Sequence, residues 1–465
     1  MSSKMYSIKR SILRKFPRIF MVTLWITAVA VCLAVFCRTG SYTRVVDRMD
    51  DYHGCISLFA SLTFSCFTLL YFLIQALLAV CYRPAKTLPD GELPPLTVII
   101  PAYNEGRQIY KAIESATRAD YPAGKLEIMA INDGSVDDTW QWIQKAAADF
   151  PGRVQAIDVP ENRGKKHALC LGIRQASGEV IVTIDSDSAI EPDALRKIAS
   201  PFADPKVGAV AGNIRVMNLN AGAIPKMLDT AFAFGFEFMR AAQSVIHSVL
   251  CTPGALSAYR LSAVKPLVPH WEKQTFLGKP ATIGEDRAIT SMLIRSNWHV
   301  DFQSNAFAYT NMPTTYRGLC RMLTRWCRSD IRENFIMIAF AFFNLTHFRF
   351  RQFGLQLNVI FASASIILPL FSIPALLLAI IGAPQATLPV LVIGNLLWSA
   401  VPAFIYAVRY GIKDAIWAFI YGFYYLPFIS WIGVYSLLTV RNTSWITRQK
   451  QAKHPVLHTS IQKDA

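Results

Sequence analysis

Charged residues are scarce in this chain of 465 residues, and the scarcity is uneven. Asp, Glu, Lys and Arg together make up 17% of the sequence, whereas they are about a quarter of a typical soluble protein. Hydrophobic residues make up 53%, and they gather in long runs near both ends, while residues 84–330 resemble ordinary soluble α/β sequence. The sequence therefore predicts a membrane protein with a central water-soluble domain.

The sequence also lacks paired cysteines, and it lacks acidic side chains near its N-terminus. The nine cysteines show no spacing typical of a metal site or a disulfide framework. Residues 1–18 carry six basic side chains and no acidic one. The net charge of +16 does not predict nucleic-acid binding, because basic residues flank the apolar runs as they do on the cytoplasmic side of membrane proteins. A polyanionic substrate or an anionic lipid bilayer would account for the remaining charge.

Two apolar runs precede the central domain. The first, residues 19–36, follows a basic segment as in a signal peptide, but it lacks a small-residue cleavage site and is long enough to span a bilayer. The second is residues 56–80. We expect residues 1–83 to form a cytoplasmic N-terminus followed by two transmembrane helices.

Further membrane segments are predicted after the central domain. Residues 331–354 have apolar faces broken by charges, as in an interfacial helix. Residues 355–440 hold three apolar segments, namely 355–381, 388–408 and 416–438. Residues 441–465 form a basic tail, which favours the cytoplasmic side. Three full crossings would leave this tail outside, so we expect 416–438, which contains glycine and proline, not to cross fully.

The central domain is organised around residues 179–188, EVIVTIDSDS. The β-branched run predicts a buried strand that ends at Asp185 and Asp187. Open α/β sheets bind ligands at the carboxyl ends of their strands, and carboxylates together with phosphate oxygens coordinate Mg²⁺ or Mn²⁺. An isolated Asp-x-Asp can also simply solvate a loop, so the surrounding motifs must decide between these readings.

Three strand–loop–helix units precede this strand. Their strands are residues 96–100, 126–131 and 154–159. Such alternation predicts a parallel sheet with right-handed crossovers, and it places the loops after the strands on one edge. Beyond residue 188 the pattern is looser: residues 207–211 predict a strand followed by a bend, and 225–249 a long apolar helix.

The loops at this edge carry polar side chains. Tyr103 and Glu105 follow the first strand and suit a nucleobase, while Asp133 could accept a hydrogen bond from the base or ribose. Lys165 and Lys166 precede a helix N-terminus, which itself favours anions, and so could clamp a diphosphate. A lysine pair is also common on a solvated helix face.

Seven motifs occur in one order along the chain: VIIPAYNE, NDGS, NRGKKHA, IDSDS, GALSAYR, GEDR and RW. As a set they resemble glycosyltransferase family 2, and more narrowly the processive membrane synthases of hyaluronan, chitooligosaccharide, poly-N-acetylglucosamine and cellulose. The resemblance covers about residues 96–330. It implies an α/β GT-A domain, Rossmann-like with a mixed, mainly parallel sheet, which is cytoplasmic and embedded between transmembrane and interfacial helices.

The resemblance also implies a UDP-sugar donor, a Mg²⁺ or Mn²⁺ ion and a set of donor-site residues. The residues implied for the donor are Tyr103, Glu105, Asp133, Lys165, Lys166, Asp185 and Arg448. Asp187 and Asp185 would hold the metal ion.

For catalysis the resemblance implies Asp286 as general base with Glu285 beside it, Arg325 on the leaving diphosphate and Trp326 beneath the acceptor sugar. An inverting transfer needs such a base, and it needs cations where charge develops on the diphosphate. The alternatives are a helix N-terminal acid pair for Glu285 and Asp286 and an interfacial-belt tryptophan for Trp326.

Two further residues, Gly254 and Arg287, are implied on the acceptor side. The family usually has Gln-x-x-Arg-Trp, and this chain has Met322 at the glutamine position. Methionine cannot supply amide hydrogen bonds, so the acceptor contact expected there is open, and so is the identity of the sugar.

These features predict an inverting, processive enzyme of the cell membrane that elongates a β-linked polysaccharide, its growing acceptor, from UDP-sugar and translocates it. One alternative is a non-processive transferase that adds one sugar to a lipid carrier. Another is a nucleotide-sensing membrane protein or transporter with a retired catalytic domain. The GEDR motif resembles that of the amino-sugar synthases, and this resemblance implies an N-acetylglucosamine-containing product. Linkage, chain length and oligomeric state stay open.

Overall fold

The fold is taken from a computed structural model that describes residues 52–343 and 350–442. The predicted first span at 19–36 and the predicted donor residue Arg448 lie outside the described residues.

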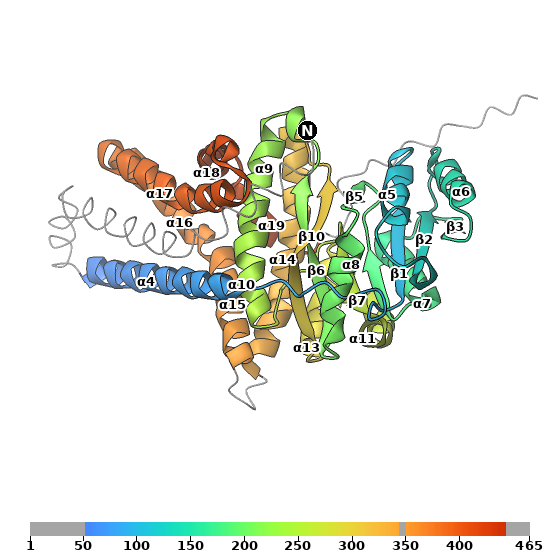
Figure 1. The fold of residues 1–465 in the computed structure, drawn as a ribbon. Coiled ribbons are helices and arrows are strands. Elements are labelled where there is room, and N and C mark those ends of the chain that lie inside the picture. Colours follow the sequence, from blue (N-terminus) through green and yellow to red (C-terminus); the bar gives the residue numbers. More distant parts are fainter. Residues whose placement is uncertain (1–51, 344–349, 443–465) are drawn as a thin grey trace, which may run out of the picture.

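An eight-stranded mixed sheet forms the centre of the soluble domain, with strand order β3-β2-β1-β4-β7-β6-β10-β5 (Figure 1). The strands are β1 Leu96–Ala102, β2 Leu126–Asp133, β3 Val154–Val159, β4 Val180–Thr183, β5 Ser188–Ile190, β6 Val207–Val216, β7 Ser257–Arg260 and β10 His299–Thr310. Strands β3, β2, β1 and β4 are mutually parallel, as are β6 and β10, whereas β7 and β5 run antiparallel to their neighbours. A separate hairpin pairs β8 Thr275–Phe276 with β9 Lys279–Pro280.

Burial explains why the central strands are almost continuously apolar. Every residue of β1, β4 and β6 is buried, because helices cover both faces of the sheet. The bend predicted after 207–211 is wrong, since β6 continues to Val216. Gly212 does not mark a bend. It allows the strand to pack closely, because a Cβ there would lie 2.7 Å from the Leu256 side chain.

Short helices connect the strands and surround the sheet. They are α5 Gln108–Thr117, α6 Thr139–Asp149, α7 Lys165–Gln175, α8 Ala194–Ala199, α11 Leu261–Val264, α12 Val268–Glu272 and α13 Glu285–Arg295. In place of the long helix predicted over 225–249, the structure has a helical column in which the hydrogen-bond pattern changes from α to π and back. Its parts are α9 Ala223–Phe234, a π-helix Gly235–Arg240 and α10 Ala241–Val245. This column stands between the sheet and the apolar helices (Figure 1).

The apolar helices lie on one side of the soluble domain, where α4, α16 and α17 extend away from the sheet (Figure 1). They are α4 Tyr52–Cys81, α15 Phe350–Ile367, α16 Pro369–Gly382, α17 Pro384–Tyr410, α18 Ile416–Phe428 and α19 Trp431–Leu438. Within the described ranges, one helical segment, Thr387–Tyr410, is long and apolar enough to cross a membrane. The number rises to three if each of two bent helix pairs is one span.

The segment 416–438 is one of these bent pairs, with 49° between its two helices. Its bend is compatible with a broken span or with a re-entrant loop. The expectation that it does not cross fully therefore stays a prediction.

No separate helix begins at residue 331. One continuous helix, α14 Tyr316–Phe343, runs through the predicted boundary at 330. Two of the charges that suggested a bilayer-surface helix, those of Arg332 and Glu333, are buried in protein, since they pair with each other at 2.9 Å and are 3% and 1% exposed. The domain that contains the sheet thus continues directly into this helix.

Candidate active site

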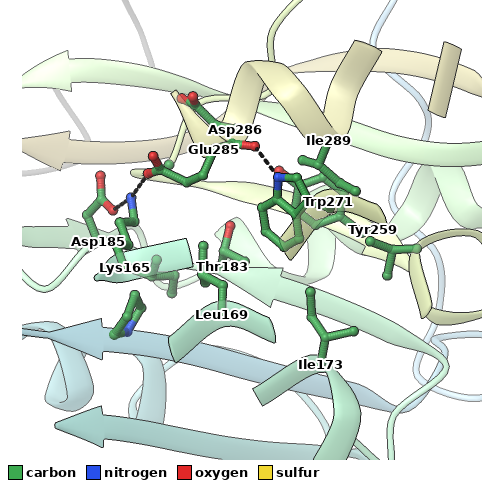
Figure 2. A pocket seen from close by; sticks show the side chains of 14 residues that line it. Lys165, Leu169, Ile173, Thr183, Asp185, Tyr259, Trp271, Glu285, Asp286 and Ile289 are labelled. Atoms are coloured by element: carbon green, nitrogen blue, oxygen red, sulfur yellow. Dashed lines mark hydrogen bonds and ion pairs between the residues drawn. The ribbon is translucent and has the colours of Figure 1, made fainter. Parts of the chain in front are cut away.

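Three charged side chains from distant parts of the chain meet at the carboxyl end of β4. The Lys165 ammonium, in the first turn of α7, pairs with Asp185 after β4 and lies 3.0 Å from Glu285 Oε1 at the start of α13. Figure 2 shows Lys165 between the two carboxylates, with Asp286 next along α13. Glu285 is 3% exposed, so its charge depends on this partner.

The loop before α7 is held by Asp133 at the end of β2. Its two carboxylate oxygens accept hydrogen bonds from the backbone N–H groups of Arg163, at 3.1 Å, and Gly164, at 2.8 Å. Burial raises the pKa of Asp133. Asp133 therefore lies at the predicted edge, where it fixes the loop that presents Lys165.

Tyr103 and Glu105 follow β1, which lies between β2 and β4 in the sheet. The Thr139 hydroxyl accepts a hydrogen bond from the Glu105 N–H at 2.8 Å, and the Asn104 carboxamide oxygen accepts one from the Val136 N–H at 2.9 Å. These bonds fasten the loop after β1 to the loop after β2. The three residues predicted for uridine thus sit at the ends of adjacent strands.

The two neighbouring acids of α13 have opposite pKa shifts. Burial alone would raise the pKa of Glu285, but the charges of Lys165 and Arg325 outweigh it and lower that pKa. Burial and the Glu285 carboxylate together raise the pKa of Asp286 to about 6. Asp286 Oδ1 accepts the Arg287 N–H at 2.8 Å, and the Cys251 thiol lies 4.0 Å from Oδ2. A buried carboxyl tuned in this way is a candidate general base.

Helix α14 contributes Arg325 and Trp326. The Arg325 charge reaches Glu285, as its effect on that pKa shows, and the Trp326 ring lies 6.2 Å from the ring of Phe232. Met322, at the position where the family has glutamine, is 6% exposed and packs in an apolar cluster with Leu228 and other residues of α9, α18 and α19. Met322 is therefore a packing residue in this chain.

Lys166 and Arg287 are engaged elsewhere. Lys166 Nζ donates to the Trp271 carbonyl at 2.8 Å, and burial lowers the pKa of its ammonium to about 8. Arg287 Nε lies 3.2 Å from Asp330 Oδ1 of α14. The structure brings Lys165 to Asp185 but directs Lys166 to Trp271, and it uses Arg287 to join α13 to α14.

Gly254 lies directly against the charged cluster. A Cβ at this position would be 2.6 Å from Lys165 Nζ and 3.0 Å from Asp185 Oδ2. A side chain at position 254 would therefore have to displace the Lys165 ammonium or the Asp185 carboxylate, whereas glycine leaves both in place.

Trp271 and Cys251 are site residues that the sequence analysis did not identify. Trp271 Nε1 donates to the Glu285 carbonyl at 3.1 Å and lines a small cavity together with Lys165 and Asp185 (Figure 2). Neither residue belongs to a short motif, so only the tertiary structure reveals that both contact the α13 acids.

The residues available for a metal ion are Asp185 and Asp187. Asp187 Oδ1 is 3.4 Å from the Thr310 hydroxyl. Throughout residues 52–343 and 350–442, no group of three or more His, Cys, Asp or Glu side chains is arranged to hold an ion. Mg²⁺ usually takes only one or two carboxylates and completes its shell with substrate phosphates and water, so this pair fits an ion that arrives with a nucleotide.

Gly284 fixes the start of α13 and provides a test. Its φ of 67° is left-handed, and a Cβ would lie 1.6 Å from the Ser329 hydroxyl of α14. We expect Gly284→Ala to displace Glu285 and Asp286 and to lower kcat about a hundredfold, the effect of a displacement of about 1 Å. Steady-state kinetics with the purified variant measure this. Gly124→Ala, where a Cβ meets nothing within 4 Å, should behave as wild type; equal kcat values for the two variants would contradict the assignment.

Comparisons with known proteins agree with this geometry. The family model for glycosyl transferase family 2 matches residues 97–268. An N-acetylglucosaminyltransferase of Rhizobium leguminosarum bv. viciae is 30% identical over 80% of this chain and 86% of its own length. One of Rhizobium meliloti is 34% identical over 56% of this chain and only 60% of its own length. A hyaluronan synthase of Streptococcus pyogenes is 28% identical over 82% of this chain and 89% of its own length.

A solved structure is similar in fold. The mannosyltransferase PcManGT from Pyrobaculum calidifontis, in complex with GDP-Man and Mn²⁺, superposes with a TM-score of 0.54 at 22% identity, over 75% of this chain and 97% of that protein. This likeness confirms the GT-A-like glycosyltransferase fold with its mixed, largely parallel sheet. Fold, motifs and relatives agree, and the chain belongs to glycosyltransferase family 2.

Proposed function

We propose that this glycosyltransferase is a membrane-embedded, inverting and processive enzyme that elongates a β-linked polysaccharide from UDP-sugar. The observation that carries the proposal is the convergence of Asp185, Lys165 and Glu285 beside Asp286, whose pKa is raised. Relatives named N-acetylglucosaminyltransferase and hyaluronan synthase support UDP-N-acetylglucosamine as a donor.

The donor would lie across the carboxyl ends of β1, β2 and β4. Tyr103 and Glu105 would contact the uridine, with Asp133 holding the adjoining loop in place. The Lys165 ammonium would move from Asp185 to the diphosphate, because phosphate oxygens offer it a new anionic partner. A Mg²⁺ or Mn²⁺ ion held by Asp187 and Asp185 would supply further neutralisation of the diphosphate charge.

Transfer would begin when Asp286 accepts the proton of the acceptor hydroxyl. The hydroxyl oxygen attacks the anomeric carbon, the bond to the diphosphate breaks, and inversion follows from attack on the opposite face. Arg325 and Lys165 would stabilise the negative charge on the departing UDP. Trp326 would stack against the acceptor sugar and hold its hydroxyl near Asp286.

The exposed apolar side chains of the C-terminal helices support membrane embedding. Side chains on α16 are strongly exposed although they are apolar, with Ile381 at 79%, Leu378 at 71% and Phe371 at 69%. Such a surface is stable when it faces lipid. We place the soluble domain on the cytoplasmic side, where nucleotide sugars are made.

Turnover by the purified protein tests the proposal. UDP-GlcNAc, UDP-GlcA and UDP-glucose are offered singly and in pairs, with Mg²⁺, with Mn²⁺ or with EDTA, and UDP release is followed. We expect release with UDP-GlcNAc that depends on the divalent ion, and a ladder of long products on a gel. Single-sugar products would instead support transfer to a lipid carrier. UDP binding without release from any donor would support a nucleotide sensor.

Activity is expected to fall as the pH drops below about 6. Asp286 accepts a proton only as the carboxylate, and because burial and Glu285 raise its pKa to about 6, the carboxylate is lost below that pH. The value of kcat/KM should then fall about tenfold per pH unit. UDP affinity measured by calorimetry over the same range separates this loss from a loss of binding; a flat profile down to about pH 4.5 would contradict the role of Asp286.

A further inference from the structure

A buried polar network joins the soluble domain to the end of the membrane helix α17. Asp229 of α9 is fully buried, and it accepts hydrogen bonds from Arg215 Nε of β6 at 2.8 Å and from the Tyr406 hydroxyl of α17 at 2.9 Å. The Arg215 guanidinium lies 3.3 Å from the centre of the Tyr410 ring. A buried ion pair is stable only when all its polar atoms have partners, so the docked position of α17 is part of what satisfies this pair.

A second buried carboxylate, that of Glu237, also connects the soluble domain to α17. Glu237 is 8% exposed, and its Oε1 accepts hydrogen bonds from Asn213 Nδ2 at 2.7 Å and from the Tyr410 hydroxyl at 2.8 Å. Arg409 of α17 lies 3.5 Å from the other oxygen but is largely exposed. Both hydrogen bonds to Glu237 Oε1 thus come from neutral donors, and one of these donors, Tyr410, belongs to α17.

Glu237 belongs to the π-helix Gly235–Arg240, whose last residue contacts the loop 251–254. Arg240 Nε donates to the Cys251 carbonyl at 3.1 Å, and its guanidinium lies 3.8 Å from the centre of the Phe236 ring. The Cys251 thiol in turn lies 4.0 Å from Asp286 Oδ2. Single π-helical turns are uncommon and are concentrated at functional sites. Here the π-helix directs Glu237 to α17 and Arg240 to the loop 251–254.

We propose that this path positions the catalytic base: docking of α17 through Tyr410 onto Glu237 sets the π-helix, and Arg240 then holds the 251–254 loop against Asp286. Arg240 and Glu237 are positioning residues, since they act on Asp286 through Cys251. The geometry of transfer is thereby linked to the position of a membrane helix. This inference rests on the proposed function, in which Asp286 is the base.

Chemical labelling of Cys251 tests the path without any need for sugar transfer. Burial raises the pKa of the Cys251 thiol to about 12, so its alkylation should be slow in the wild type. We expect Tyr410→Phe and Arg240→Met, in the full-length protein in detergent, to speed N-ethylmaleimide labelling of Cys251 about tenfold, as read by peptide mass spectrometry. Cys170, a buried residue of α7, reports global unfolding and should keep its wild-type rate.

Kinetics provide the second measurement. A base displaced by a fraction of an ångström should lower kcat about tenfold while the donor KM stays within about twofold. Arg240→Lys, which can still donate to the Cys251 carbonyl, should recover most of the loss. Tyr425→Phe on α18, a matched removal of a hydroxyl from an exposed tyrosine, should change neither measurement.

The inference is overturned if Cys251 labelling is unchanged in both Tyr410→Phe and Arg240→Met, or if Cys170 accelerates equally, since the effect would then be general unfolding. Failure of the proposed function looks different. In that case wild-type protein releases no UDP from any donor, while the labelling of Cys251 still responds to Tyr410→Phe.

Discussion

Asp286→Asn should lower the rate of sugar transfer by about three to four orders of magnitude, the upper range for loss of a general base. The amide has nearly the size of the carboxylate but cannot accept the acceptor proton. The Asp286 carboxylate touches Cys251 and the Arg287 N–H rather than Lys165 or Asp185, so donor binding should survive. The predicted signature is a lost kcat with an unchanged dissociation constant for UDP.

The matched control is Asp149→Asn. Asp149 ends α6 and bonds to the exposed hydroxyl of Tyr110, so its loss should leave kcat within about twofold of wild type, as for an ordinary surface substitution. Calorimetry measures the dissociation constant for UDP in both variants, and steady-state kinetics measure their kcat. Retained turnover in Asp286→Asn would remove Asp286 as the base.

Lys165→Met should damage both folding and donor binding. The ammonium separates Asp185 from Glu285, and without it two carboxylates face each other with no cation between them. Removing one partner of a buried ion pair costs about 3–5 kcal/mol, and we expect about 3 kcal/mol here because Asp185 is partly exposed. Loss of the positive charge at the diphosphate should also lower kcat/KM about a hundred- to a thousandfold.

Lys166→Met is the matched comparison for Lys165→Met. The Lys166 ammonium bonds to the Trp271 carbonyl, so its removal should cost about 1 kcal/mol of stability for one lost hydrogen bond, with little change in donor KM. Thermal unfolding measures the stability of both variants, and steady-state kinetics measure their donor KM. Equal losses of donor affinity would contradict the separate roles that the structure gives the two lysines.

Much of the site could be predicted because motif residues at strand ends necessarily share an edge. Asp133, Asp185 and the residues after β1 follow strands that run parallel and adjacent, so the sequence pattern alone places them together. The difference between Lys165 and Lys166 could not be predicted. Successive helix residues point about 100° apart, and which of the two faces Asp185 depends on how α7 packs.

Other features depend on long-range pairing that no local pattern encodes. Strand β7 inserts antiparallel between β4 and β6, and the π-helix Gly235–Arg240 has no residue signature of its own. The charges of Arg332 and Glu333 on α14 suggested a helix on the bilayer surface, yet these two side chains are buried against protein. Periodicity shows that a charged residue recurs on one helix face, but it does not show whether lipid, water or another helix covers that face.

A crystallographic map of the full-length protein with UDP and Mn²⁺ would show whether the nucleotide, the metal ion and the acids share one site, because Mn²⁺ is located by its anomalous scattering. We expect one manganese peak beside Asp187 and Asp185, with the diphosphate within hydrogen-bonding reach of Lys165 and on the same face as Asp286. A nucleotide bound away from the carboxyl end of β4, or a manganese ion held by neither aspartate, would contradict it.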